Sequence, residues 1–166
     1  MQISQLNQHS LRRFRDLFAS LAVPEIDSLP GKYRGMFVGP AWVRVIVKPA
    51  LFITGLGGWW GKELYAGGTA VNILLRKEKL ITRFRMKFAM ERSQIDGREG
   101  LALHYRKDNL LLWLFIVDEI RRIEEDVLLG MTRPKVPGLR WLALPFILQK
   151  QNNEGNPYGR KGYYPG

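Results

Sequence analysis

This sequence predicts a mainly β protein in which an N-terminal amphipathic helix precedes a closed antiparallel barrel of about eight strands. Three observations lead to this fold class: apolar residues at helical spacing near the N-terminus, strict apolar–polar alternation further along, and short turn-forming segments between apolar runs. A length of 166 residues suits one domain. We expect that domain to span residues 1–150, with a flexible C-terminal tail over residues 151–166.

The helix is predicted by the apolar residues between positions 6 and 21. They recur at intervals of three or four and so share one helical face: Leu11, Phe14, Leu17, Phe18 and Leu21. Charged residues occupy most of the opposite face. The stretch VPEIDSLPGKYRG then brings Pro24, Pro30 and Gly31, which end the helix and turn the chain.

The clearest strand is the stretch RFRMKFAME. Its apolar side chains, Phe84, Met86, Phe88 and Met90, alternate with basic ones, as a strand with one dry face requires. Leu101, Leu103 and Tyr105 repeat the pattern. Further strands are expected at residues 33–38, 42–47, 71–75, 111–122, 127–133 and 142–149, and closing them into a barrel would remove exposed edges. Residues 49–68 fit a short helix or a glycine-broken crossing over the barrel mouth equally well.

Composition limits the chemistry that the chain can perform. It has no cysteine, which excludes disulfides, thiol nucleophiles and thiolate metal sites, and its two histidines, His9 and His104, do not form a metal-binding motif. GLGG at 55–58 lacks the remainder of a phosphate-binding or dinucleotide-binding motif. We therefore expect neither a metal nor a cofactor. The N-terminus lacks the apolar core of a signal peptide, so the expected location is the cytoplasm.

The formal net charge of +11 raises the question of an anionic partner. Basic residues are densest between Arg76 and Arg92. This segment is either a solvated strand face or a surface for nucleic acid or an anionic membrane. Stacking on bases is disfavoured, because the aromatic residues of the strand point away from its basic face.

Asp118 is the most informative polar residue. It follows the apolar run LWLFIV directly, and strand alternation places it on the same face as Arg122. A carboxylate facing the barrel interior would need Arg122 or a tyrosine hydroxyl as a partner. Asp118 is thus either half of a structural ion pair or part of a ligand-binding or acid–base site.

The segment GLGGWWG sets two adjacent tryptophans among glycines. On a strand Trp59 and Trp60 would point to opposite faces, so at least one needs a lid, a partner or a ligand to cover it. The glycines give the backbone freedom to move. We interpret the segment as a gate at the barrel mouth or, alternatively, as a rigid turn whose tryptophans belong to the core.

Several short motifs resemble the GXWXG-type domain proteins, an uncharacterised bacterial family with lipocalin-like character. LPGKYRG is similar to the naming motif, with Tyr33 at the tryptophan position, and GWWGKEL resembles an aromatic-Gly-Lys element. RMKF, Tyr105, DEIRRIEEDVLLGM and LPFILQKQ resemble the second half, so the likeness runs from about Leu29 to Gln149. The resemblance implies a lipocalin-like barrel rather than any particular reaction.

The leading functional hypothesis is the binding of a hydrophobic small molecule of the acyl, polyketide, terpenoid or tetrapyrrole type inside the barrel. Apolar contacts would come from Trp59, Trp60, Met86, Phe88 and Met90. The ligand's polar end would meet Tyr33, Tyr105, Asp118 and Arg122. The alternative is an isomerase or cyclase with Asp118 or Tyr105 as the acid–base residue, and the third is a basic module for nucleic acid or anionic membrane. The oligomeric state is left open.

Overall fold

The computed structural model describes residues 3–107, 109, 111–136, 138–139 and 142–151. Its helices are α1 (Ile3–Leu6), α2 (Leu11–Ser20) and α3 (Ala41–Ile53), with two 3-10 helices, η1 (Ile26–Ser28) and η2 (Leu111–Phe115). The strands are β1 (Gly31–Phe37), β2 (Trp59–Tyr65), β3 (Thr69–Arg76), β4 (Lys79–Arg92), β5 (Glu99–Tyr105), β6 (Ile116–Glu124), β7 (Val127–Pro134) and β8 (Leu144–Lys150).

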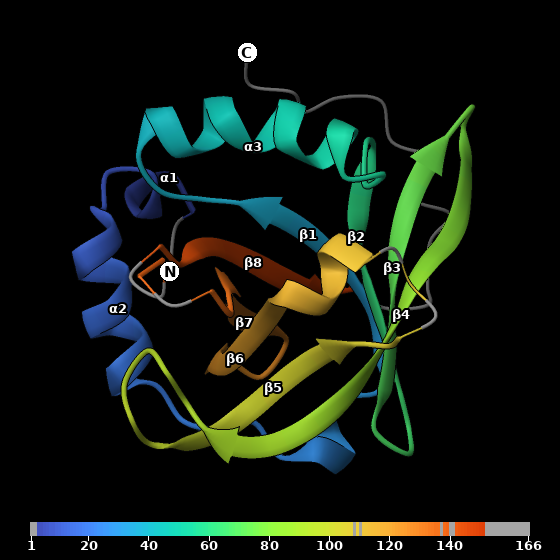
Figure 1. The fold of residues 1–166 in the computed structure, drawn as a ribbon. Helices are drawn as coiled ribbons and strands as arrows, with labels where there is room; N and C mark the ends of the chain where they lie inside the picture. The colour runs from blue at the N-terminus through green and yellow to red at the C-terminus, as the bar shows by residue number, and fades with distance from the viewer. Residues whose placement is uncertain (1–2, 108, 110, 137, 140–141, 152–166) are drawn as a thin grey trace.

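Each strand pairs antiparallel with the next, and β1 pairs with β8 to close the barrel. The predicted fold class, an N-terminal helix followed by an antiparallel barrel, is confirmed. The barrel has two ends. We use the name mouth for the end that contains the last residues of β1 and β3, and the name closed end for the opposite one. In Figure 1 the strands surround a common interior, α2 lies against an outer wall, and α3 runs along one side of the barrel.

Helix α2 forms as the sequence predicts. The Ser10 hydroxyl caps it by accepting a hydrogen bond from the Arg13 amide at 3.2 Å. Phe14 and Phe18 are fully buried in a cluster between α2 and the outside of β7 and β8, which includes Met131 and Ile147. A second apolar cluster fills the barrel itself. The wall between β6 and β8 therefore has an apolar layer on each side.

The expectation of a strand over residues 42–47 is wrong, because these residues belong to α3. Val43 and Val47 are buried and Leu51 is half-buried, which is the four-residue spacing of a helix that touches the barrel along one line. A run rich in β-branched residues suits a strand equally well, so alternation misled the prediction. The open question about residues 49–68 is answered: α3 ends, a glycine-rich loop follows over 54–58, and β2 begins at Trp59.

Two further boundaries differ from the expected strands. The segment predicted as one strand over 111–122 begins as η2, and β6 starts only at Ile116. Strand β4 carries a bulge opposite Val71 and Asn72, where Phe84 has a φ of 54°. After this bulge along β4, the side chains of Met86 and Phe88 pack toward the barrel interior as expected.

At the closed end η1 and the residues after it complete the barrel. Leu29 is buried, and the Tyr33 hydroxyl donates a hydrogen bond to the Leu29 carbonyl at 2.9 Å. Of the predicted tail, only Gln151 falls inside the described residues, and 152–166 lie outside them. None of the helices in the described ranges combines the length and apolar character needed to cross a bilayer.

Candidate functional site

Four strands each place one polar side chain inside the barrel. Lys62 on β2 forms an ion pair with Asp118 on β6, with 2.8 Å between Nζ and Oδ2, and both side chains are 2% exposed. Lys62 also donates to the Oδ1 of Asn72 on β3 at 2.8 Å. The Nδ2 of Asn72 in turn donates to the hydroxyl of Tyr105 on β5 at 3.2 Å. We call these four residues the interior network.

Two neighbours complete the hydrogen bonding of the interior network. The Thr132 hydroxyl donates to Oδ1 of Asp118 at 2.6 Å, and the Trp59 indole donates to Oδ1 of Asn72 at 3.0 Å. Oδ1 of Asp118 therefore accepts a hydrogen bond, and Oδ2 is held by the ion pair with Lys62. The charges of Lys62 and Asp118 cancel, which leaves the interior polar but electrically neutral.

Aromatic rings surround the Lys62 ammonium. The ring centres of Tyr105, Phe146 and Trp59 lie 5.7, 5.8 and 5.9 Å from Nζ. Ring faces attract cations, so this surrounding offsets part of the cost of burying the charge. Lys62 donates hydrogen bonds to Asn72 and to the sulfur of Met86, 3.6 Å away, and it forms the ion pair with Asp118.

Glycines on neighbouring strands make room for these rings. A Cβ atom at Gly35 would lie 2.4 Å from the Trp59 ring, and one at Gly130 would lie 2.1 Å from the Phe146 ring. Each ring thus occupies the place of a missing side chain. Gly35 ends the GKYRG motif and Gly130 lies in VLLGM, so these glycines of the motifs shape the wall beside Lys62.

The Tyr105 phenol keeps its proton at any ordinary pH. Burial, followed by the charge of Asp118, raises the pKa of its phenol well above the usual value, although the hydrogen bond from Asn72 opposes the shift. Its oxygen accepts from Asn72, and none of the described residues accepts its hydrogen. The Tyr105 hydrogen is consequently available to a group that enters the barrel.

A cavity of about 50 Å³ lies against the interior network. Its polar side is formed by the network and Thr132. The remaining lining is apolar and comprises Phe37, Leu51, Leu56, Trp59, Trp113 and Phe146. The space suits one or two water molecules, whereas sites for larger organic ligands measure about 300 to 1,000 Å³. A larger ligand therefore requires movement of the side chains that cover the cavity.

The cover over the cavity comes from α3, the 54–58 loop and η2. Leu51 and Leu56 close the mouth side, and Trp113 of η2 stacks on Tyr105 with 4.8 Å between ring centres. The Trp113 indole donates to the Thr54 carbonyl at 3.0 Å, which ties η2 to the end of α3. The loop turns through Gly55, whose φ of 83° favours glycine.

A surface hollow of about 400 Å³ lies beside this cover. It is lined by Gly55, Leu74, Arg76, Ile81, Arg83 and Phe84, so it separates the 54–58 loop from the β3–β4 hairpin. The Phe84 ring lies 5.5 Å from the Trp113 ring. The lining of the hollow therefore meets the lining of the cavity at these two rings.

Three of the predicted site residues line the cavity: Asp118, Tyr105 and Trp59. Met86 lies beneath Lys62 and touches its ammonium group. The partners predicted for Asp118 were Arg122 or a tyrosine hydroxyl, but Lys62 takes that place. The structure thus brings together the acid–base pair of the prediction and one of its two tryptophans.

The other predicted residues lie elsewhere. Tyr33 and Arg122 are at the closed end, where Arg122 donates to the Glu125 carbonyl at 2.9 Å and to the Ser28 hydroxyl. Trp60 faces away from the cavity and packs against Arg34, 5.2 Å from its ring centre. Phe88 packs against the edge of the interior cluster, and Met90 is exposed. Within GLGGWWG, Leu56 and Trp59 line the cavity, so the gate at this segment stays a prediction.

Sequence reasoning missed Lys62 and Asn72. Both carried a signal, because each is a polar residue at an inward position of an apolar strand, Lys62 two residues before Leu64 and Asn72 between Ala70 and Leu74. A buried acid implies a buried base. Finding that base on another strand requires knowing how the strands pair around the barrel.

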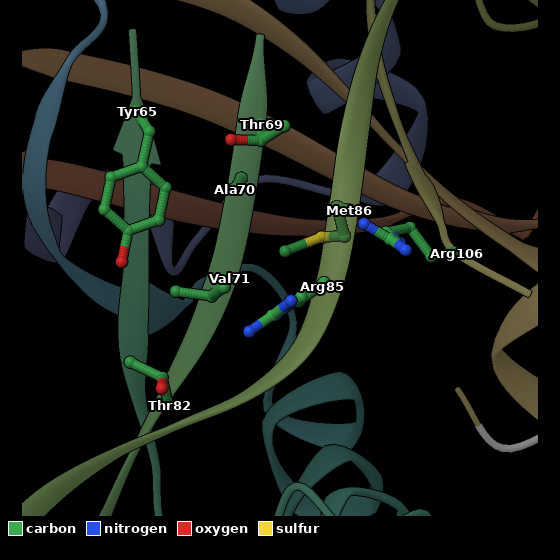
Figure 2. Close-up of a pocket in the computed structure, with 8 residues that line it drawn as sticks. All are labelled: Tyr65, Thr69, Ala70, Val71, Thr82, Arg85, Met86 and Arg106. Atoms are coloured by element: carbon green, nitrogen blue, oxygen red, sulfur yellow. The ribbon is translucent and has the colours of Figure 1, made fainter. Parts of the chain in front are cut away.

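A second hollow, of about 410 Å³, lies on the outer wall of β2, β3 and β4. Figure 2 shows the Tyr65 ring and the Arg85 guanidinium directed toward Val71 and Thr82. Tyr65, Thr82, Arg85 and Arg106 are exposed, so water reaches the polar groups of this hollow. It lacks the desolvated network that distinguishes the interior cavity.

Comparisons with known proteins support the fold. No family model and no curated protein matches the chain. A crystal structure of a protein from Thermomonospora curvata is similar, with a TM-score of 0.67 and 18% sequence identity over 90% of this chain and 93% of that one. At this identity the likeness shows the barrel fold alone. The resemblance to GXWXG-type domain proteins stays a prediction.

Proposed function

We propose that the barrel binds a mainly apolar small molecule whose polar end is a neutral hydrogen-bond acceptor, such as a carbonyl, ether or hydroxyl oxygen. The observation that carries this proposal is the Tyr105 hydroxyl, buried at the cavity with its hydrogen unused by the described residues. Acyl, polyketide and terpenoid compounds include members with such an oxygen. The apolar lining supports the rest of the ligand.

The neutrality of the interior network argues against an anionic ligand. A carboxylate entering the cavity would have to compete with Asp118 for Lys62 and would meet the charge of Asp118 at close range. An uncharged oxygen needs only the Tyr105 donor and leaves the ion pair intact. Entry would displace Trp113 from the Phe84 ring and open a route from the hollow beside the β3–β4 hairpin.

The acid–base alternative, an isomerase or cyclase, receives less support. Asp118 is held by Lys62 and Thr132, and Tyr105 keeps its proton because its pKa is raised. Both arrangements favour fixed hydrogen bonding over proton exchange. Of the two residues that sequence reasoning assigned to catalysis, Tyr105 therefore serves recognition in this proposal, and Asp118 forms a structural ion pair.

The test compares a medium-chain methyl ketone with the alkane of the same length. Titrated against tryptophan fluorescence, the ketone should bind more tightly to the wild-type protein, since Trp59 and Trp113 border the cavity. Tyr105→Phe should bring the ketone close to the alkane and leave the alkane unchanged. No response to either compound, or equal binding of both by the wild type, would contradict the proposal.

A further inference from the structure

The outer side of α3 is an exposed apolar surface. Val45, Phe52 and Ile53 are 69%, 71% and 82% exposed, and Trp42 and Ile46 are 49% and 44% exposed. Only Val43, Val47 and Leu51 turn toward the barrel. A surface helix normally places polar residues on its outer side, so apolar residues on both sides indicate that something covers this one. We call these five exposed residues the α3 outer face.

Basic residues border the α3 outer face. Arg44 and Lys48, one turn apart, follow one flank of the helix. The β3–β4 hairpin adds Arg76, Lys77 and Lys79, with Arg83 just beyond it, and all of these side chains are exposed. Over 41–53 and 76–83, six basic residues stand against a single acidic one, Glu78.

The helix and the hairpin lie on the same side of the molecule. Figure 1 shows α3 ending near the hairpin, with both projecting beyond the barrel. A Cβ atom at Gly57 would lie 2.9 Å from the Phe52 ring and 3.5 Å from the Arg76 guanidinium, which puts these two side chains next to each other. The apolar surface and its basic border are thus continuous.

We propose that the α3 outer face and the β3–β4 hairpin dock on an anionic membrane surface. Apolar side chains on one side of a helix enter the boundary between headgroups and acyl chains, and tryptophan favours that depth. Lysine and arginine beside them attract anionic headgroups. A protein partner would need its own acidic border to match this charge, whereas an anionic lipid surface supplies it everywhere.

Docking in this orientation places the hollow beside Gly55 at the membrane. Arg76 lines that hollow and lies next to Phe52 of the α3 outer face. A ligand leaving the bilayer would meet the route to the cavity without crossing water. The docking itself depends only on the surface, so it holds whether or not the barrel binds the ligand proposed above.

The test is cosedimentation with vesicles of two compositions. Vesicles of equal parts phosphatidylglycerol and phosphatidylcholine should bind the full chain at least tenfold more tightly than pure phosphatidylcholine, and added salt should weaken the binding. Phe52→Ser with Ile53→Ser should lower the affinity at least tenfold. Lys77→Ser with Lys79→Ser should lower it less and reduce the salt dependence.

The matched control is Ile26→Ser with Met90→Ser, which removes two exposed apolar side chains away from α3 and the hairpin and should leave binding unchanged. Circular dichroism checks that each variant folds. Absent binding, equal binding to both compositions, or binding that survives the Phe52 and Ile53 changes overturns the proposal. So does a stable dimer in sedimentation velocity that these two changes dissociate, because a second copy would then cover the face.

Discussion

Asp118 and Glu119 are neighbours on β6, yet they serve opposite sides of the barrel wall. Asp118 points inward to Lys62, while Glu119 points outward and accepts a hydrogen bond from Arg133 at 2.5 Å and one from the Ser93 hydroxyl. Both carboxylates are almost fully buried. Burial and ion pairing alone therefore do not distinguish a ligand site from a structural contact.

The outer polar groups hold other parts of the chain in place. Ser93, beyond the end of β4, binds Glu119, and Arg121 donates to both oxygens of Asp96 at 3.2 and 3.0 Å. The Arg121 guanidinium also lies 4.7 Å from the ring centre of Phe18 on α2. These contacts fasten the β4–β5 turn and α2 to the barrel wall.

The inner groups differ because their unused donor borders a cavity. On the outer side, Nε and Nη1 of Arg121 also lack a partner among the described residues, but they belong to a guanidinium packed against the Phe18 ring. Lys62 donates to Asn72 and pairs with Asp118. Tyr105 keeps one hydrogen that the described residues do not use. The comparison teaches that a buried polar cluster becomes a candidate site when space adjoins it and one of its donors remains available.

The largest expected effect is on stability when the inner ion pair loses one partner. Asp118→Ala leaves the Lys62 ammonium buried without its counter-charge, so we expect the free energy of unfolding to fall by about 3 to 5 kcal/mol. Urea denaturation followed by circular dichroism measures the loss. A change below about 1 kcal/mol, which is typical of exposed ion pairs, would show that water reaches Lys62.

Removing the outer carboxylate should lower the stability of the protein but leave ligand binding unchanged. Glu119→Gln removes the charge facing Arg133, and we expect a loss of about 2 to 3 kcal/mol. The ketone affinity of the folded protein should stay within about twofold of the wild type, below the effect of one hydrogen bond. Affinity loss as large as that of an inner variant would remove the distinction between the two regions.

Replacing both members of the inner pair should restore most of the stability that a single replacement removes. Lys62→Met with Asp118→Leu removes both charges, and the unfolding free energy should return to within about 1 to 2 kcal/mol of the wild type, since apolar replacements of buried pairs are often neutral. The lost desolvation cost compensates for the lost attraction. Double-mutant-cycle analysis of the urea midpoints tests this recovery.

A smaller effect is expected from Tyr105→Phe. The substitution leaves the ring stacked on Trp113 and removes one hydrogen bond, so the unfolding free energy should fall by about 1 kcal/mol. Loss of the donor should weaken ketone binding by about fivefold to tenfold. Tyr65→Phe, which changes an exposed hydroxyl on β2, is the matched control and should alter neither quantity.

The two regions should also respond to opposite extremes of pH. Burial raises the pKa of Tyr105, and that of Tyr33 to about 12, so their contribution is complete below about pH 10 and is lost as the pH rises further. Burial alone would raise the pKa of Asp96, but hydrogen bonds from the Arg98 amide and from Arg121 lower it. The contribution of Asp96 is therefore present above about pH 4 and is lost on acidification below it.

Melting temperatures of three proteins across the pH range check this prediction. Tyr105→Phe should reduce the alkaline loss in part, because Tyr33 retains its share. Asp96→Asn should reduce the acid loss without affecting the alkaline one. Identical pH profiles for the wild type and both variants would show that neither group contributes to the pH dependence.

The fold was predictable where a single pattern determined the element. Alternation identified β4 and β5, and helical spacing identified α2, because each of these elements has one dry face. Helix α3 was missed since apolar residues cover both its sides, which hides the helical period in a run of valine and isoleucine. Its unusual outer face is the same property that suggests a membrane.

The site was half predictable. A carboxylate after an apolar run indicated buried charge at Asp118, and Tyr105 shared the inward face of its strand. The partner Lys62 lies 56 positions earlier in the chain and meets Asp118 only because the barrel closes. Arg122 was the nearest base on the same face of the strand, but four residues along a strand span about 13 Å, which places it at the closed end instead.

Calorimetric titration of the methyl ketone into three proteins tests the central claim most directly. The wild type and Glu119→Gln should bind with nearly equal affinity, and Tyr105→Phe should bind about fivefold to tenfold more weakly while remaining folded. That result would assign recognition to the inner side of the barrel wall and structure to its outer side. Undiminished binding by folded Tyr105→Phe, or an equal loss in Glu119→Gln, would contradict the account.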